Sequence, residues 1–129
     1  MEIGYKFQHS FKFTQEDVIG FATVTGDNNP IHLDTNYAEK SMFKKPIMHG
    51  MLGASIFSKV FGTMFPGEGS IYLNQSLSFL RPMFAEELYN AIFEVKEVLP
   101  EKKRVIITTT ILNSEGKATI TGEAALIYI

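Results

Sequence analysis

Asp27 and His32 form a pair whose types and spacing could carry out acid–base chemistry. They lie in the segment 25–32, where Gly26 and Pro30 predict a turn between two helical patterns. A carboxylate and an imidazole that lie close together can hold and polarise one water molecule, because each gives or takes a proton and each alters the pKa of the other. Such a pair is suited to adding water to a substrate or removing it. The same residues also fit a plain Asx turn beside a surface histidine, and the pair alone does not decide between the two interpretations.

The segment 48–64 predicts a helix next to this turn. Residues 50–64 have helical length and apolar side chains on nearly every side, which is typical of a buried helix. Gly53 and Ala54 near its start let another backbone or a ligand come close. His49, directly before the helix, is interpreted as a packed or capping histidine rather than as a second base.

Before the turn, the sequence predicts a strand and a capped helix. Aromatic and polar residues alternate over residues 5–13, with one slip at 9–10, which favours an edge strand. Thr14 offers an N-cap hydroxyl, acidic residues follow in the first helical turn, and Gly26 ends the helix. A short helix is also predicted over residues 34–40. Asp27 and His32 therefore lie on a loop between two helices.

The second half of the chain changes to strands. Residues 70–80 predict one long strand, and residues 88–99, 105–112 and 117–129 predict three more, separated by turns. A buried helix followed by long antiparallel strands predicts an α+β fold in which a curved sheet wraps around the helix 50–64. The open edges of such a sheet favour pairing with a second copy, so we expect a homodimer or an oligomer built from dimers.

Length and composition exclude several classes of protein. The 129 residues predict one domain, residues 1–129, large enough to bury a core. The net charge of −2 gives no general attraction for nucleic acid or an anionic membrane, and neither is expected as a partner. No cysteine is present, which excludes disulfides and a thiolate nucleophile. The N-terminus lacks the pattern of a secretory signal, and no apolar run is long enough to span a bilayer, so we expect a cytoplasmic protein.

The most specific motif is the run from Phe21 to His32, followed by Ala38. It resembles the complete signature of the MaoC-like, R-specific enoyl-CoA hydratase family, also called hydratase 2. Four further runs resemble the short single-domain members that supply (R)-3-hydroxyacyl-CoA for polyhydroxyalkanoate synthesis: residues 49–52, 69–73, 75–79 and 121–124. The resemblance spans nearly the whole chain. It implies the hot-dog fold, in which the helix 50–64 lies inside a wrapped antiparallel sheet.

The resemblance also implies roles for individual residues. Asp27 and His32 would be the catalytic pair, acting on one water that adds to a trans-2-enoyl-CoA to give the (R)-3-hydroxyacyl-CoA, and Asn29 would orient the loop. The backbone N–H of Gly50 would stabilise the enolate-like oxygen of the thioester, which agrees with the unpaired amides and the positive end of the dipole at a helix start. Which member of the pair makes each proton transfer stays open.

Neither a cofactor nor a metal is expected. The thioester makes the α proton acidic enough once its oxygen is stabilised, so no cofactor is required. The three histidines, His9, His32 and His49, have no spacing that suggests zinc.

Further residues are candidates for substrate binding. An acyl chain that runs beside the helix 50–64 would contact Ser58 and Phe61, which are otherwise interpreted as core residues. Lys44, Lys45 and Arg81 could bind the phosphates of coenzyme A or acidic side chains of acyl carrier protein, or could simply be solvated.

Three other functions remain open from the sequence. The nearest is an (R)-3-hydroxyacyl-acyl-carrier-protein dehydratase, which runs the same chemistry towards the enoyl product. A second is a hot-dog protein that binds thioesters without turnover, against which the presence of both Asp27 and His32 argues. A thioesterase fits less well, because the Asp–His loop before the central helix matches the hydratase arrangement. Acyl chain length, carrier and pathway are not determined.

Overall fold

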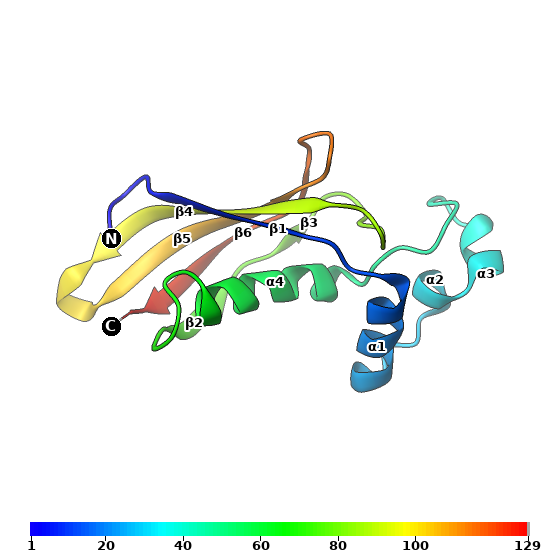
Figure 1. Ribbon diagram of the computed structural model, residues 1–129, viewed down its shortest axis with the longest axis horizontal. Coiled ribbons are helices and arrows are strands. Elements are labelled where there is room, and N and C mark those ends of the chain that lie inside the picture. The colour runs from blue at the N-terminus through cyan, green and yellow to red at the C-terminus, as the bar shows by residue number, and fades with distance from the viewer. Residues whose placement is uncertain (129) are drawn as a thin grey trace.

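The computed structural model of the chain describes residues 1–128. Its strands are β1 (Lys6–Phe11), β2 (Ile71–Gln75), β3 (Ser78–Phe79), β4 (Tyr89–Leu99), β5 (Arg104–Leu112) and β6 (Ala118–Ile127). Its helices are α1 (Gln15–Thr25), α2 (Pro30–Leu33), α3 (Thr35–Glu39) and α4 (Gly50–Thr63), and the 3-10 turn η1 (Pro100–Lys102) joins β4 to β5. The strands form one antiparallel sheet in the order β1-β4-β5-β6-β2, with β3 also paired to β6. Figure 1 shows this sheet extending over α4. The α+β fold predicted from the sequence is confirmed.

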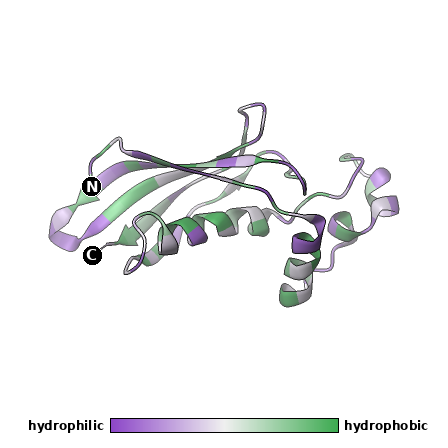
Figure 2. Ribbon diagram, viewed as in Figure 1, coloured by the Kyte–Doolittle hydropathy of each residue, from purple (hydrophilic) through white to green (hydrophobic). Residues whose placement is uncertain are grey.

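Helix α4 packs on one face of the sheet through its apolar side. Phe57 and Phe61 lie edge-on against Phe93 of β4, with ring centroids 5.7 and 5.3 Å apart. Full burial of such a side chain contributes about 1.5–3 kcal/mol, so these contacts hold the helix firmly. Figure 2 shows hydrophobic residues along α4 and along the strands that face it. The prediction that α4 is buried on nearly every side is wrong for the single chain, because the sheet covers one side only and leaves six of its residues exposed: Met51, Ser55, Ser58, Lys59, Gly62 and Thr63.

The central strands follow the predicted alternation. In β4 the side chains of Tyr89, Ala91, Phe93 and Val95 are buried, and the residues between them are more exposed. Antiparallel pairing with β5 continues this inner layer. The predicted strand faces in this part of the chain are therefore confirmed, because the period of two residues is strict and one face is buried.

The strand predicted over residues 70–80 is divided in the structure. Strand β2 ends at Gln75 and β3 begins at Ser78, and the regular ladder to β6 is interrupted between them, although the Ser76 amide still donates to the Glu123 carbonyl at 2.9 Å. Gly122 of β6 lies under this break, and a Cβ on Gly122 would stand 1.9 Å from the carbonyl oxygen of Ser76. The two backbones approach so closely that only glycine fits. The apolar periodicity did not reveal this irregularity.

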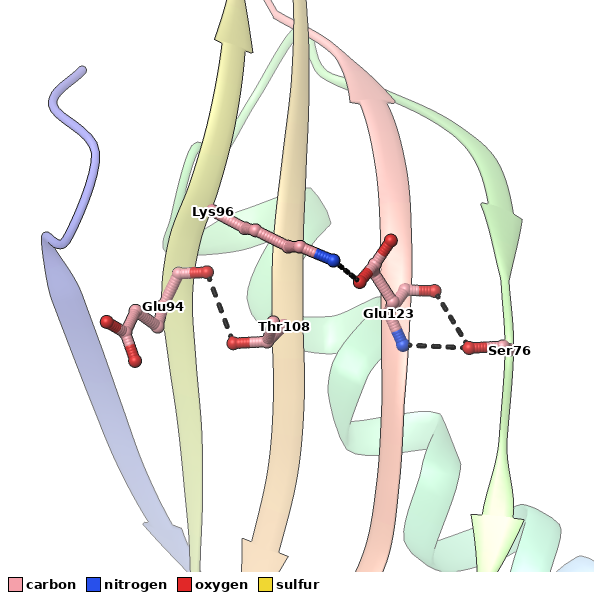
Figure 3. A network of polar contacts seen from close by, with 5 residues as sticks. All are labelled: Ser76, Glu94, Lys96, Thr108 and Glu123. Atoms are coloured by element: carbon pink, nitrogen blue, oxygen red, sulfur yellow. Dashed lines mark hydrogen bonds and ion pairs between the residues drawn. The ribbon is translucent and has the colours of Figure 1, made fainter.

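The face of the sheet opposite α4 carries polar contacts between strands (Figure 3). The Lys96 ammonium lies 2.7 Å from the Glu123 carboxylate. The Glu123 amide donates to the Ser76 hydroxyl at 3.0 Å, and the Thr108 hydroxyl donates to the Glu94 carbonyl at 3.4 Å. We call these five residues the outer polar cluster.

The first helices gather at one end of the molecule, beyond the N-terminal end of α4 (Figure 1). Helix α1 begins at a capping box, in which the Asp17 amide donates to the Thr14 hydroxyl and the Thr14 amide donates to the Asp17 carboxylate. It ends at Gly26, whose φ of 79° is the left-handed conformation that glycine adopts freely. Both predicted ends are confirmed, as is the short helix α3 with Asp34 as its N-cap.

Within residues 1–128, no helix combines the length and the apolar character that crossing a membrane requires.

Candidate active site

Three titratable residues from separate parts of the chain meet in front of α4. One ligand-type atom each of Asp27, His32 and His49 lies within 4.8 Å of the other two. Asp27 is exposed, whereas both histidines are buried. The pair predicted from the sequence is therefore brought together, with a second imidazole beside it.

His32 lies on a helical turn and not on the open loop that the sequence predicted. Pro30 is the first residue of α2, where its fixed φ suits a helix, and the Asn29 side chain accepts a hydrogen bond from the Ile31 amide at 3.2 Å. The Gln15 amide group donates to the His32 carbonyl at 3.0 Å and ties α2 to the start of α1. Helix α2 is capped at its first turn and tied to α1 near its end, so the backbone that carries the His32 imidazole has a fixed position.

The protonation pattern of the His32 ring follows from its partners. Nδ1 lies 2.8 Å from the carbonyl oxygen of Ile47, which can only accept, so Nδ1 carries the proton. In the neutral ring Nε2 is then the bare acceptor. Burial lowers the pKa of His32, and repulsion from His49 adds to this, while the Ile47 carbonyl and Asp27 act in the opposite direction. His32 therefore keeps a basic nitrogen free to lower pH than an exposed histidine does.

Asp27 is fixed by a local turn. Its amide donates to the Thr25 hydroxyl at 3.2 Å, and its carboxylate accepts from the Asn29 amide at 3.4 Å. The side chain of Asn29, which the sequence predicted to orient the loop, caps α2 instead of contacting Asp27. Residue 29 thus contacts both parts of the turn, through its amide to Asp27 and through its side chain to the start of α2, and its predicted orienting role stays a prediction.

His49 lies between the two members of the pair and α4. Its ring stacks on that of His32, with centroids 3.8 Å apart and planes 28° apart, and contacts the Phe21 ring at 4.8 Å. Its Nε2 lies 3.0 Å from the carbonyl oxygen of Asp27. The interpretation of His49 as packed is confirmed, but the capping role is wrong, because its side chain makes no cap hydrogen bond to α4.

The same three residues meet the spacing requirement for a metal site but not the directional one. Imidazole lone pairs lie in the plane of the ring. Since the two rings are stacked 28° apart, their lone pairs run almost side by side and do not converge on one ion. In addition, Nδ1 of His32 and Nε2 of His49 face carbonyl oxygens. The arrangement fits acid–base work, and the predicted absence of a metal stays a prediction.

Gly50 begins α4 beside an apolar cavity. No residue among 1–128 accepts a hydrogen bond from its amide, as expected for the first amide of a helix without a side-chain cap. A Cβ on Gly50 would stand 2.7 Å from the Phe79 ring. Because residue 50 has no side chain, the space between this ring and the start of α4 stays open. The adjoining cavity of about 450 Å³ includes Gly50, Phe79, Met83 and Arg81 in its lining.

Comparison with known proteins identifies the family. Residues 1–116 match the family described as MaoC like domain. The chain belongs to this family. It is 42% identical over 126 residues to the (R)-specific enoyl-CoA hydratase of Aeromonas caviae, and the match covers 98% of this chain and 94% of that one.

Two solved structures extend the comparison. One is an (R)-hydratase from A. caviae involved in PHA biosynthesis, with a TM-score of 0.96, 41% identity, and coverage of 100% of this chain and 98% of that one. The other is an R-hydratase from Pseudomonas aeruginosa, with a TM-score of 0.94, 40% identity, and coverage of 99% and 82%. The hot-dog fold implied by the sequence is therefore confirmed.

The predicted substrate-binding residues of this MaoC-like domain lie in different places. Arg81 lines the cavity at Gly50, and its guanidinium donates to the Ala118 carbonyl at 2.7 Å. Ser58 is exposed further along α4, and Phe61 is buried in the core, so neither lies in the lining of that cavity.

Sequence reasoning missed three parts of the site. The Ile47 carbonyl is a main-chain group that no side-chain motif reports. Phe79 was assigned only to a strand face, and its contact with Gly50 depends on the break after Gln75. The third part is His49, and its position directly before Gly50 in the sequence was the signal that could have placed it in the site.

Proposed function

We propose that this MaoC-like domain catalyses the R-specific hydration of trans-2-enoyl-CoA to (R)-3-hydroxyacyl-CoA, and the reverse dehydration. The observation that carries the proposal is the meeting of Asp27 and His32, within 4.8 Å of each other, in front of a helix whose first amide has no acceptor among residues 1–128. The (R)-specific enoyl-CoA hydratase of A. caviae, similar over nearly the full chain, supports the choice of substrate.

In the proposed reaction, one water lies between Nε2 of His32 and the Asp27 carboxylate. Nε2 takes a proton from the water while the water oxygen bonds to the β carbon, and the pair returns a proton to the α carbon. The tautomer that the Ile47 carbonyl selects supports the basic role of Nε2. Charge that develops on the thioester oxygen is stabilised by the Gly50 amide, and a donor of this kind contributes about 3–4 kcal/mol.

The test follows the absorbance of an enoyl thioester and the chirality of its product. We expect the enoyl band to decrease and the product to be the R-3-hydroxyacyl thioester. An S product would refute the assignment. No turnover of any enoyl thioester would favour a protein that only binds thioesters, and release of free thiol, seen with a thiol-reactive dye, would indicate a thioesterase.

The carrier is proposed to be coenzyme A, with acyl carrier protein as the second candidate. Of the basic residues near the site, Arg81 is bonded to a backbone carbonyl, and Lys45 lies 3.6 Å from Glu87 and 4.3 Å from the centre of the Phe84 ring. Lys44 is exposed beside them. The coenzyme A substrates named for the relatives from A. caviae and Methylorubrum extorquens support coenzyme A as the carrier, and exposed lysines are of a type that can bind its phosphates. Parallel assays with the same acyl group on each carrier distinguish the two.

The acyl chain is proposed to run beside α4, where Ser58 and Phe61 were predicted to form its floor. Phe61 packs edge-on against Tyr72 and Phe93, with centroids 5.2 and 5.3 Å away. If Phe61 stops a tunnel, Phe61→Ala raises the kcat/KM ratio of eight-carbon over four-carbon substrates about tenfold or more, because each buried methylene contributes about 0.8 kcal/mol. If Phe61 is only core, the change costs about 3–5 kcal/mol of stability and leaves the ratio unchanged.

The protein is proposed to act as a homodimer. In the part of the chain that the structure describes, strand β2 pairs with β6 alone and forms one edge of the sheet. Ile71, Tyr72 and Leu73 on this edge are exposed, as is Met51 on α4. A second copy would cover this apolar edge. Light scattering of dilute protein tests the proposal, and an active monomer would refute it. The cytoplasm stays the predicted compartment.

A further inference from the structure

His49 occupies the N-cap position of α4, but its side chain makes no cap hydrogen bond to the helix. Residues favoured at that position accept a hydrogen bond from the first helical turn, and His49 accepts none. The side chain turns away from α4 and is only 2% exposed. Burying a polar ring is unfavourable unless its polar atoms find partners, so its contacts need a reason.

Among residues 1–128, the His49 ring makes its hydrogen bond to the main chain of Asp27. Nε2 donates to the Asp27 carbonyl at 3.0 Å, across 22 residues of sequence. The other hydrogen bonds of Asp27 within residues 1–128 reach only Thr25 and Asn29, two residues away. The hydrogen bond from His49 is therefore the one that fixes the Asp27 turn relative to α4. Nδ1 of His49 is buried and has no hydrogen-bond partner among the described residues.

The other contact of the ring is with His32. The two imidazoles stack at 3.8 Å, so His49 covers one face of the His32 ring while the Ile47 carbonyl holds its edge. Rotation of His32 away from its orientation would break the hydrogen bond and the stack together. Asp27 and His49 are the titratable groups that face His32, and Gln15 reaches only its backbone.

We propose that His49 is a positioning residue for the dyad. Its Nε2–H fixes the main chain of Asp27, and its ring supports His32, so that the carboxylate, the bare Nε2 and the Gly50 amide keep one geometry. This inference rests on the proposed hydration. Small displacements at a reacting centre are costly, since about 1 Å can reduce the rate roughly 100-fold.

Two variants at position 49 separate the contacts. His49→Phe keeps a ring against His32 but removes the donor to Asp27, and we expect kcat to fall about tenfold or more with KM nearly unchanged. His49→Gln places an amide N–H at a similar reach, and we expect it to recover most of the loss relative to His49→Phe. The control is Val105→Ala, a change at a buried core residue of β5 that has no part in the site, which should lower Tm and leave kcat unchanged.

A double-mutant cycle tests whether His49 acts through Asp27. In an Asp27→Asn background, His49→Phe should cause little further loss, because the carboxylate that it positions is already gone. A full multiplicative loss would overturn the proposal, and so would an equal fall of kcat in the core control, because kcat would then simply follow Tm. So would wild-type kcat in His49→Phe.

A measurement without substrate keeps this test separate from the proposed function. The nitrogen NMR shifts of the His32 ring report its tautomer. We expect the Nδ1–H form in the wild type and in His49→Phe, which keeps a ring against His32, and a minor share of the Nε2–H form in His49→Gln, which removes the ring and lets His32 turn from the Ile47 carbonyl. If the wild type hydrates no enoyl thioester, the proposed function fails while the NMR result still judges the positioning role. An unchanged tautomer in both His49 variants would contradict that role.

Discussion

Two polar clusters of this MaoC-like domain are built from similar residues and differ in how each is held. The candidate site combines Asp27, His32 and His49, and the outer polar cluster combines Glu94, Lys96 and Glu123 with two hydroxyl residues. In the site, each imidazole has one nitrogen facing a main-chain carbonyl oxygen. On the sheet, the Lys96 ammonium and the Glu123 carboxylate face each other and are about half exposed.

The difference explains why only one cluster is suited to chemistry. A charge that is already paired in water has little left to offer a substrate, and its interaction is screened. A ring whose one nitrogen is engaged and whose other nitrogen is bare can exchange a proton at a defined point. Main-chain anchoring next to a free helix amide, more than the number of charges, distinguishes the site.

The largest expected effect is on the pair itself. Asp27→Asn, His32→Ala and His32→Gln should each reduce turnover about 100-fold or more, because positioned proton transfer contributes about that much. Steady-state assays on an enoyl thioester measure the loss, and circular dichroism checks that folding is intact. The Asp27→Asn/His32→Gln double variant should be little worse than either single one, since both act on one water. Additive losses would show that the two residues have separate roles.

Much of the fold could be predicted because its signals are local. The Thr14 cap and the Gly26 end of α1 each depend on a few neighbouring residues, and the alternation in β4 depends on burial of one face. The break between β2 and β3 could not be predicted. It depends on the distant Gly122, whose missing Cβ admits the Ser76 carbonyl, and no periodicity within residues 70–80 contains that information.

The candidate site also has one part that could be predicted from the sequence and one part that could not. Asp27 and His32 lie five residues apart and could be identified from the sequence, together with the free amide of Gly50. The burial and the tautomer of His32 depend on Ile47, which contributes its main chain, and the place of His49 depends on tertiary packing. A sequence motif names the reacting groups, whereas a long-range backbone contact determines which nitrogen of His32 carries the proton.

The next effect concerns the free amide of α4. Gly50→Ala should reduce kcat/KM about tenfold, because its Cβ would stand 2.7 Å from the Phe79 ring and would push that ring into the approach to the amide. Gly62→Ala is the matched control on the same helix, since a Cβ there meets nothing within 4 Å. It should stabilise the protein by about 0.5–1 kcal/mol through helix propensity and leave activity unchanged. Equal kinetics for the two variants would remove Gly50 from the site.

A smaller effect is expected on changing pH. Because burial lowers the pKa of His32, its neutral form should persist below the ordinary value of 6.5, and kcat/KM should fall only when the pH passes below the lowered pKa. The stability of the folded chain should change with pH in the same direction as the activity. The unfolded chain binds a proton at His32 below 6.5 while the folded chain resists it, so the free energy of unfolding decreases as the pH falls through that window. Urea titrations of the wild type and His32→Gln measure this difference, and identical pH dependence in both would exclude His32 as its source.

The smallest effect is expected on the outer polar cluster. The hydrogen bond to Glu123 raises the pKa of Lys96, so any stability from this pair is present below the ordinary pKa of 10.5 and is lost only as the pH rises through the higher folded value. At neutral pH the pair is intact, but it is exposed and screened by salt. Lys96→Met should therefore leave kcat unchanged and shift Tm very little at physiological salt, with a slightly larger shift at low salt. Glu123→Gln, which keeps the shape of the side chain, should behave alike. A loss of activity in either variant, without a matching fall in Tm, would mean that the sheet transmits charge or strain to the dyad, and the contrast between the two clusters would no longer hold.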